Sequence, residues 1–222
     1  MEWNTIYLEN HDQPRSVSRF GSIEYWKESS KLLATLLLTL KGTPFIFEGE
    51  EIGMTNFDFV SMDEVEDVES KNIYKILSSV HVPKGIKWKM IKNTSRDNAR
   101  TPMQWSNKDG AGFTTGKPWL GINKNKDRIN VEMEESDKDS ILSYYKTLIA
   151  FRKKSEDLME GDYKLIENGR DVTEYKRGGL SIILNHSDKE IKREIEGEIL
   201  LSTENERKEG SLEPWEAIIV RK

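Results

Sequence analysis

A histidine and an aspartate stand side by side in residues 9–15, which read ENHDQPR and follow the short apolar run 5–8. A neutral imidazole beside a carboxylate can hydrogen-bond to adjacent hydroxyl groups and can steady nearby positive charge. His11 and Asp12 are therefore candidates for binding a sugar. A His-Asp dipeptide taken by itself is more often part of an ordinary loop, in which Asp12 would cap a helix.

Further blocks of sequence decide between these interpretations. GTPFIFEGEEIGMTN occupies residues 42–56, RDNARTPMQW occupies 96–105, and AGFTTGKPW occupies 111–119. Together with NHDQPR, and in this order, they resemble the α-glucosidase branch of glycoside hydrolase family 13. The resemblance extends to the end of the chain and is closest to oligo-1,6-glucosidases and trehalose-6-phosphate hydrolases, between which the sequence does not choose.

The resemblance implies roles for individual residues in a retaining glycosidase, whose two catalytic carboxyl groups stand about 5 Å apart. Asp12 would be a third carboxylate, which holds ring hydroxyls and stabilises the oxocarbenium-like transition state. His11 would donate to neighbouring hydroxyls, and Arg96 would belong to the glucose-binding subsite. Glu69 aligns with a position that contacts the second sugar in some relatives, although a carboxylate in so charged a loop is usually only solvated.

The same resemblance implies that the principal catalytic carboxylates are absent. In this family the nucleophilic Asp and the acid/base Glu lie on barrel strands four and five, ahead of the NHD block, which here begins at Asn10. We therefore expect the C-terminal part of an α-glucosidase, inactive by itself. The alternatives are a non-catalytic module that binds carbohydrate or completes a split glucosidase, and a truncated product without a function of its own.

Other charged residues in these blocks have less definite roles. Adjacent side chains at a strand end point to opposite faces, so at most one of Glu50 and Glu51 should face the site. Arg100 is expected to form a salt bridge that holds its loop, whereas Arg15 is consistent with either a structural or a binding role. Most relatives have Gln where this chain has Glu48.

The elements that would position the site follow a strand, helix, strand order. Residues 5–8 and 44–47 are strand-like, and a helical stretch covers about 25–40. This order predicts a parallel pair of strands, with Gly42 in the left-handed conformation that often follows a helix. The resemblance makes these elements strand seven, helix seven and strand eight of a (β/α)8 TIM barrel, whose active sites lie at the carboxyl ends of strands. Asp12 and Glu50 would then lie on the catalytic face.

Residues 54–137 have an irregular pattern that predicts a long loop or subdomain on the substrate side, with a short helix at 72–79. Trp105, Phe113 and Trp119 are expected to form a local core that holds this loop together. An apolar helical stripe then covers 141–151 and predicts the final helix of the barrel.

Short strand-like runs separated by turn signals follow residue 158. They cover 163–166, 172–176, 180–184, 190–195, 199–201 and 217–220. The predicted fold class is therefore α/β plus all-β. Residues 1–157 would form the C-terminal part of the TIM barrel, with its last two strands and helices, and residues 158–222 an antiparallel β-sandwich domain.

Composition limits the partners. Of the 222 residues, 33% are charged, the net charge is −5 and opposite charges are interleaved, so no basic face suited to nucleic acid is expected. The most apolar run, 32–40, is far shorter than the roughly 20 residues that cross a membrane. His81 and His186 have no neighbouring ligand spacing, so we expect neither metal nor cofactor.

The absence of cysteine weakly favours a cytoplasmic location, and no signal peptide is apparent at the N-terminus. The expected partners are an α-glucoside or oligosaccharide in the complete enzyme, and the N-terminal half of the barrel. Self-association is an alternative, because a partial barrel would leave strand edges and the leucine-rich surfaces of the helices at 25–40 and 141–151 in water.

Overall fold

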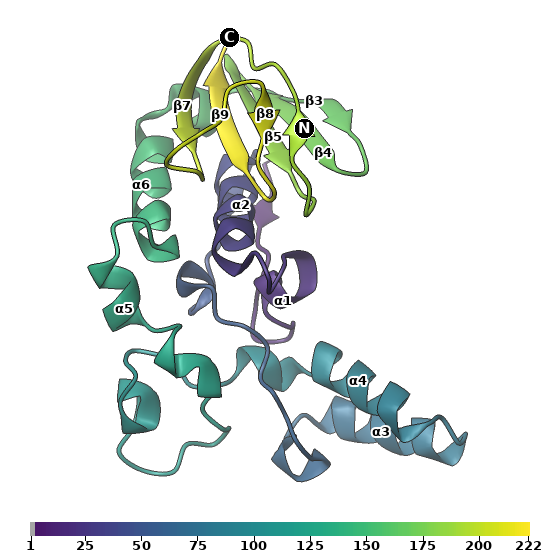
Figure 1. Ribbon diagram of the computed structural model, residues 1–222. Coiled ribbons are helices and arrows are strands. Elements are labelled where there is room, and N and C mark those ends of the chain that lie inside the picture. Colours follow the sequence, from purple (N-terminus) through teal and green to yellow (C-terminus); the bar gives the residue numbers. More distant parts are fainter. Residues whose placement is uncertain (1–2) are drawn as a thin grey trace. The chain divides into compact units, whose positions relative to one another are not determined.

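Two compact units make up the chain, and the computed structural model describes residues 3–222 (Figure 1). The first unit contains the residues up to Leu8, residues 21–45 and residues 138–222. The second contains residues 9–20 and 46–137. The predicted boundary between residues 157 and 158 lies inside the first unit and stays a prediction.

A parallel pair of short strands opens the first unit. Strand β1 (Thr5–Ile6) pairs with β2 (Thr43–Pro44), and helix α2 (Trp26–Thr39) lies between them in the sequence. The predicted strand, helix, strand order and its parallel pairing are therefore confirmed, with strands of two residues each. Their membership in a closed barrel stays a prediction.

Gly42 joins the helix to the second strand, but not in the predicted conformation. Its φ of +141° lies outside the left-handed helical region. A Cβ atom at this position would lie 2.3 Å from the backbone oxygen of Asn4, which accepts a hydrogen bond from the Thr43 backbone nitrogen. Glycine is needed here because the backbone before β1 approaches so closely.

Helix α2 is buried between helix α6 (Ile141–Lys154) and a β-sheet. Leu32, Leu38, Leu148 and Ile182 belong to one apolar cluster that joins the two helices to the sheet. The expectation that the leucine-rich surfaces of both helices remain in water is therefore wrong, because residues of the C-terminal strands cover them. The Thr35 hydroxyl, also buried, hydrogen-bonds that of Tyr144 at 2.7 Å.

The sheet contains five antiparallel strands in the order β3-β4-β5-β9-β7 (Figure 1). These strands are β3 (Tyr163–Asn168), β4 (Val172–Arg177), β5 (Leu180–Asn185), β9 (Ala217–Arg221) and β7 (Glu198–Ser202). A separate antiparallel pair joins β6 (Ile191–Lys192) to β8 (Ser211–Leu212). All six predicted strands are present, whereas β8 was not predicted because its two residues carry no periodic signal.

Two buried arginines hold the end of helix α2. Arg152 donates from Nη1 to the backbone oxygen of Leu38 at 2.6 Å and from Nη2 to that of Gly42 at 2.8 Å. Arg177 donates from Nη1 to the backbone oxygen of Thr39 at 2.6 Å. The last carbonyls of a helix lack partners within it and carry partial negative charge, so these guanidinium groups stabilise the helix end.

The second unit consists of short helices and loops. A hairpin of α3 (Val68–Ser79) and α4 (Lys84–Thr94) packs beside a small core of Phe59, Val65 and Ile91. The other elements are α1 (Ser16–Phe20), α5 (Val131–Ser136) and the 3-10 helices η1 (Glu50–Ile52), η2 (Met62–Glu64), η3 (Arg96–Ala99), η4 (Asp109–Gly112) and η5 (Lys124–Asp127). The predicted helix at 72–79 is confirmed and begins four residues earlier, at Val68.

The three aromatic residues expected to form a local core do not form one. Trp105, Phe113 and Trp119 are 49%, 54% and 68% exposed. Backbone contacts hold their segment instead, because the nitrogens of Trp105 and Ser106 both donate to the oxygen of Ala111.

Among residues 3–222, no helix is long and apolar enough to cross a membrane.

Candidate active site

A tight turn presents the histidine and the aspartate. Asn10 accepts a hydrogen bond on its side-chain oxygen from the Asp12 backbone nitrogen at 2.8 Å, and its backbone oxygen accepts from Gln13 at 3.2 Å. The side chains of His11 and Asp12 are 71% and 48% exposed, with Nε2 of His11 3.2 Å from Oδ2 of Asp12. Asp12 does not cap a helix, since α1 begins only at Ser16.

A buried ion pair closes the loop that contains this turn. Arg15 Nη1 lies 3.1 Å from Glu9 Oε2 and donates to the backbone oxygen of Glu48 at 2.6 Å. Glu9 Oε1 accepts from the backbone nitrogen of Ser16 at 2.6 Å. Because both charged groups are enclosed, Arg15 has a structural role and is not available to a sugar.

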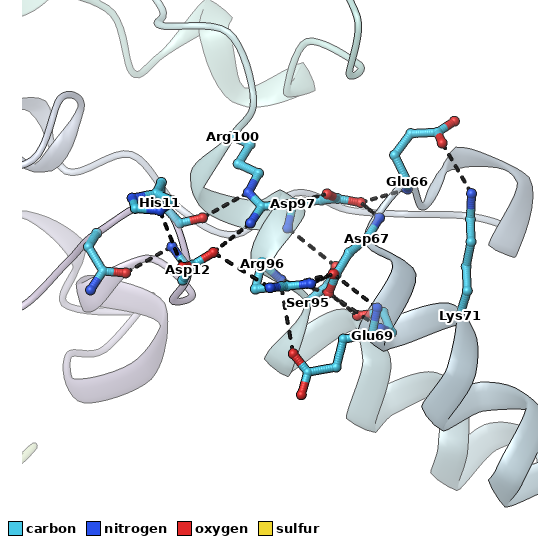
Figure 2. Close-up of polar contacts among 12 residues, drawn as sticks. His11, Asp12, Glu66, Asp67, Glu69, Lys71, Ser95, Arg96, Asp97 and Arg100 are labelled. Carbon is cyan, nitrogen blue, oxygen red and sulfur yellow. Dashed lines mark hydrogen bonds and ion pairs between the residues drawn. The ribbon is translucent and has the colours of Figure 1, made fainter.

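Arg100 connects the turn to the 96–105 block. It donates from Nη2 to Asp12 Oδ1 at 2.6 Å and from Nε to the backbone oxygen of His11 at 2.8 Å (Figure 2). Its Nη1 lies 3.9 Å from Oδ1 of the buried Asp97. The salt bridge predicted for Arg100 is confirmed, and its partner is the candidate catalytic carboxylate.

Arg96 lies beside Asp12 but is bound to a different carboxylate. Its Nη1 is 3.7 Å from Asp12 Oδ1, whereas Nε and Nη2 donate to Asp67 Oδ1 at 2.9 and 2.5 Å (Figure 2). Glu69 Oε2 lies 3.7 Å from Arg96 Nε, and the Glu69 side chain is 65% exposed. The structure therefore brings His11, Asp12, Arg96 and Glu69 into one polar cluster.

Contacts within the cluster favour the charged forms of Asp67 and Arg96. Burial would raise the pKa of Asp67, but hydrogen bonds from Arg96 and Ser70 outweigh it and lower the pKa to about 2. The hydrogen bonds to Asp67 also raise the pKa of Arg96 above its ordinary value. The cluster therefore combines fixed cations with carboxylates, a set of donors and acceptors that suits a neutral polyhydroxylated ligand.

Glu50 and Glu51 do not lie at a strand end, because their segment forms the 3-10 helix η1. Glu50 is 3% exposed and its carboxylate accepts from the Phe47 backbone nitrogen at 3.2 Å. Glu51 accepts from the Gly49 backbone nitrogen at 2.8 Å, and burial raises its pKa. Glu50 is thus buried and bonds to the backbone of its own loop, and its place on the catalytic face stays a prediction.

Two buried aspartates at the site were not singled out from the sequence. Asp67 immediately precedes α3 and accepts from the backbone nitrogens of Glu69 and Ser70, as an N-cap does. Asp97 Oδ2 accepts from the backbone nitrogens of Glu66 and Asp67 at 2.7 and 2.8 Å. The N-cap rule applied to helix α3 would have identified Asp67.

Among residues 3–222, no group of three or more histidines and carboxylates is placed to hold a metal ion.

Comparisons with protein families match most of the chain. Residues 1–161 match the catalytic domain of alpha-amylase, and residues 171–222 match the C-terminal domain of β-galactosidase. The chain is 49% identical over 180 residues to the oligo-1,6-glucosidase of Bacillus cereus, covering 79% of this chain and 32% of that protein.

Other relatives match nearly the whole chain. The identity is 41% to the oligo-1,6-glucosidase of Parageobacillus thermoglucosidasius, covering 99% of this chain and 42% of the relative. It is also 41% to the trehalose-6-phosphate hydrolase of Escherichia coli, covering 97% and 36%. The chain thus spans between 32% and 42% of the length of these three relatives.

A solved structure has the same fold over this region. Isomaltulose synthase from Klebsiella sp. LX3 superposes with a TM-score of 0.92 at 36% sequence identity, covering 99% of this chain and 43% of that protein. The match includes the C-terminal antiparallel sheet as well as the loops that carry the polar cluster, because nearly all of the chain is covered.

Proposed function

Because this chain belongs to the alpha-amylase family of glycoside hydrolases, family 13, we propose that it contributes the sugar-binding loops of a retaining α-glucosidase acting on short α-glucosides. The observation that carries this proposal is the exposed carboxylate of Asp12, held by Arg100 at 2.6 Å and next to Arg96 and His11. Because the neighbouring arginines hold the Asp12 carboxylate in place and its side chain is exposed, a sugar can reach this carboxylate.

Asp12 is the residue proposed to stabilise the transition state. Cleavage of a glucoside places positive charge on the ring oxygen and the anomeric carbon, and a preorganised carboxylate stabilises such charge more as it develops. Its oxygens also accept from ring hydroxyls. His11, 71% exposed, is the proposed donor to a neighbouring hydroxyl.

Arg96 and Glu69 are the proposed substrate-binding residues. Nη1 of Arg96 makes no hydrogen bond to Asp67, so it is available to a hydroxyl of the glucose bound at Asp12. Glu69 lies in the first turn of α3 with an exposed side chain, which suits a more distant sugar unit.

The nucleophile and the acid/base carboxyl are proposed to come from the rest of the enzyme. General acid catalysis alone typically contributes about 10²- to 10⁴-fold, and covalent catalysis is lost with the nucleophile. The 222 residues are therefore expected to be inactive by themselves.

The first unit carries the proposed contact with that missing part. Trp3, Tyr7 and Phe45 are 48%, 47% and 55% exposed around the pair β1 and β2. Each of these strands has a neighbour on one side only among residues 3–222. Exposed aromatic side chains beside open strand edges favour pairing with further strands, as in a closed TIM barrel.

The C-terminal domain is proposed to be a β-sandwich. Ile191 of β6 and Leu212 of β8 pack in one apolar cluster with Val172, Ile183 and Ile218 of the five-stranded sheet. A second small layer over one face of the sheet supports this architecture.

Two substrate classes are candidates. The relatives named oligo-1,6-glucosidase favour short α-1,6-linked glucosides, and the relative named trehalose-6-phosphate hydrolase makes a phosphorylated disaccharide the alternative. Parallel assays of the complete enzyme on isomaltose and on trehalose 6-phosphate distinguish them.

Reconstitution tests the proposal. The 222-residue chain is mixed with the N-terminal portion of the Bacillus cereus relative, and hydrolysis of an aryl α-glucoside is measured. We expect activity only in the mixture, loss of that activity with Asp12→Asn, and no change with Lys108→Ala, which lies in an exposed ion pair. Activity of the chain alone would overturn the predicted inactivity, and a mixture insensitive to Asp12→Asn would overturn the role of Asp12.

A further inference from the structure

Asp67 is a buried junction between helix α3 and the candidate site. Its side chain is 2% exposed. Oδ2 accepts from the hydroxyl of Ser70 at 2.7 Å, and Oδ1 accepts from the backbone nitrogen of Glu69 at 3.3 Å. Oδ1 also accepts from Nε and Nη2 of Arg96. One carboxylate therefore caps a helix and holds an arginine of the site at the same time.

Arg96 lies within 4 Å of three carboxylates, those of Asp12, Asp67 and Glu69, and hydrogen-bonds to only Asp67. Both of its hydrogen bonds to side chains go to Asp67, while the 3.7 Å between Nη1 and Asp12 Oδ1 is too long for a hydrogen bond (Figure 2). The guanidinium group is thus directed toward Asp12 but stops short of it. A ligand hydroxyl beside this gap would meet the guanidinium group of Arg96 on one side and the carboxylate of Asp12 on the other.

Burial explains why Asp67 holds the arginine. Hydrogen bonds between charged groups are strong, and a low local dielectric strengthens them further. Asp12 is 48% exposed, so water screens its attraction for Arg96. Asp12 is moreover already bonded to Arg100. If the charge of Asp67 were removed, Asp12 and Glu69, each 3.7 Å from a nitrogen of Arg96, would be the remaining carboxylates within reach of Arg96.

We propose that Asp67 is a positioning residue that keeps Arg96 from pairing with Asp12, so that both side chains bind the same sugar instead of each other. This inference rests on the proposed function. Through the helix cap, Asp67 also fixes the first turn of α3, and with it Glu69, relative to Arg96. Asp67 itself, being enclosed, does not touch the substrate.

The variant Asp67→Asn separates this role from a structural one. Asparagine is as good an N-cap as aspartate, so helix α3 keeps its cap while the charge that holds Arg96 is lost. Ser70→Ala is the matched control, because it removes a hydrogen bond to Asp67 and leaves Arg96 untouched.

Kinetics of the reconstituted enzyme provide the first readout. We expect Asp67→Asn to lower kcat/KM for an aryl α-glucoside by about tenfold, comparable to Arg96→Ala, and Ser70→Ala to leave it unchanged. If Asp67 acts through Arg96, adding Asp67→Asn to Arg96→Ala causes no further fall. Independent, multiplying losses in the double variant, or an equal loss with Ser70→Ala, would overturn the proposal.

A crystal structure of the 222-residue chain with Asp67→Asn provides a readout that needs no activity. We expect Nη1 of Arg96 to approach Asp12 Oδ1 to about 2.8 Å, the distance of a charge-assisted hydrogen bond. An Arg96 that stays in place would refute the positioning role. If the unsubstituted mixture is inactive, the proposed function fails, yet this structural comparison still decides the role of Asp67.

Discussion

Arg15 and Glu9 form an ion pair in which each side chain is 1% exposed, with 3.1 Å between Nη1 and Oε2. The pair joins the two ends of the loop that presents His11 and Asp12. Arg15 also donates to the backbone oxygen of Ala99 at 3.4 Å and so ties this loop to the segment of Arg96 and Arg100. A structural ion pair therefore sets the relative positions of the exposed site residues.

Removing one partner of this pair should destabilise the second unit strongly. Arg15→Met leaves the Glu9 carboxylate buried without a cation, and breaking a buried pair typically costs about 3–5 kcal/mol. Urea denaturation, followed by a probe in the second unit, measures the free energy of unfolding. Lys108→Met, which breaks an exposed pair with Glu132, is the control and should change it by less than about 1 kcal/mol. Equal effects of the two substitutions would contradict a structural role for Arg15.

Protonation of Asp67 in acid should lower the free energy of unfolding of the second unit. The folded-state pKa of Asp67 is about 2, below the ordinary value of 3.8. A depressed pKa contributes stability that is present above the unfolded value and is lost as the pH falls from about 4 to about 2. The contribution is about 2 kcal/mol, at roughly 1.4 kcal/mol per pKa unit.

Urea denaturation at pH 5 and pH 2.5 tests this. The difference in unfolding free energy between the unsubstituted chain and Asp67→Asn should shrink by more than half at the lower pH. A difference that does not depend on pH would show that Asp67 carries no depressed pKa.

Gly42→Ala should disrupt the strand pair β1 and β2. The added Cβ would meet the Asn4 backbone oxygen at 2.3 Å, and φ of +141° is unfavourable for alanine. Strain of this kind costs about 1–3 kcal/mol, to which the steric overlap adds. Thermal unfolding measures the loss. Gly85→Ala is the control because no atom lies within 4 Å of its added Cβ, and an equally mild effect at both glycines would contradict the close approach at Gly42.

The isolated chain should self-associate through the exposed aromatic residues of the first unit. Apolar side chains beside open strand edges favour pairing between copies. Light scattering over a range of concentrations should show a rising mass, which the double substitution Tyr7→Ser and Phe45→Ser lowers. Ile86→Ser, at a 63% exposed position on α4, should leave the mass unchanged. A constant monomer mass in the unsubstituted chain would refute this prediction.

Local patterns in the sequence were sufficient for helices α2 and α6 and for six strands of the C-terminal region. The apolar stripes of α2 and α6 follow the helical period, and the six predicted strands lie between turn residues, so near-neighbour propensities and burial periodicity identify them. Helix α4 was missed because the sequence KGIKWKMIKNT alternates lysines with apolar residues and gives no clear apolar face. Which side of α4 is buried depends on its contacts with α3 and with the small core that contains Ile91.

The sequence also indicated candidate residues for the site, because the blocks that contain His11, Asp12 and Arg96 resemble one family. Only the tertiary structure decided which charges pair. Arg100 and Asp12 are separated by 88 residues, and Arg96 and Asp67 by 29. The strength of an ion pair depends on burial, on competing partners and on distances of a few tenths of an ångström, and these exist only once distant segments have packed together.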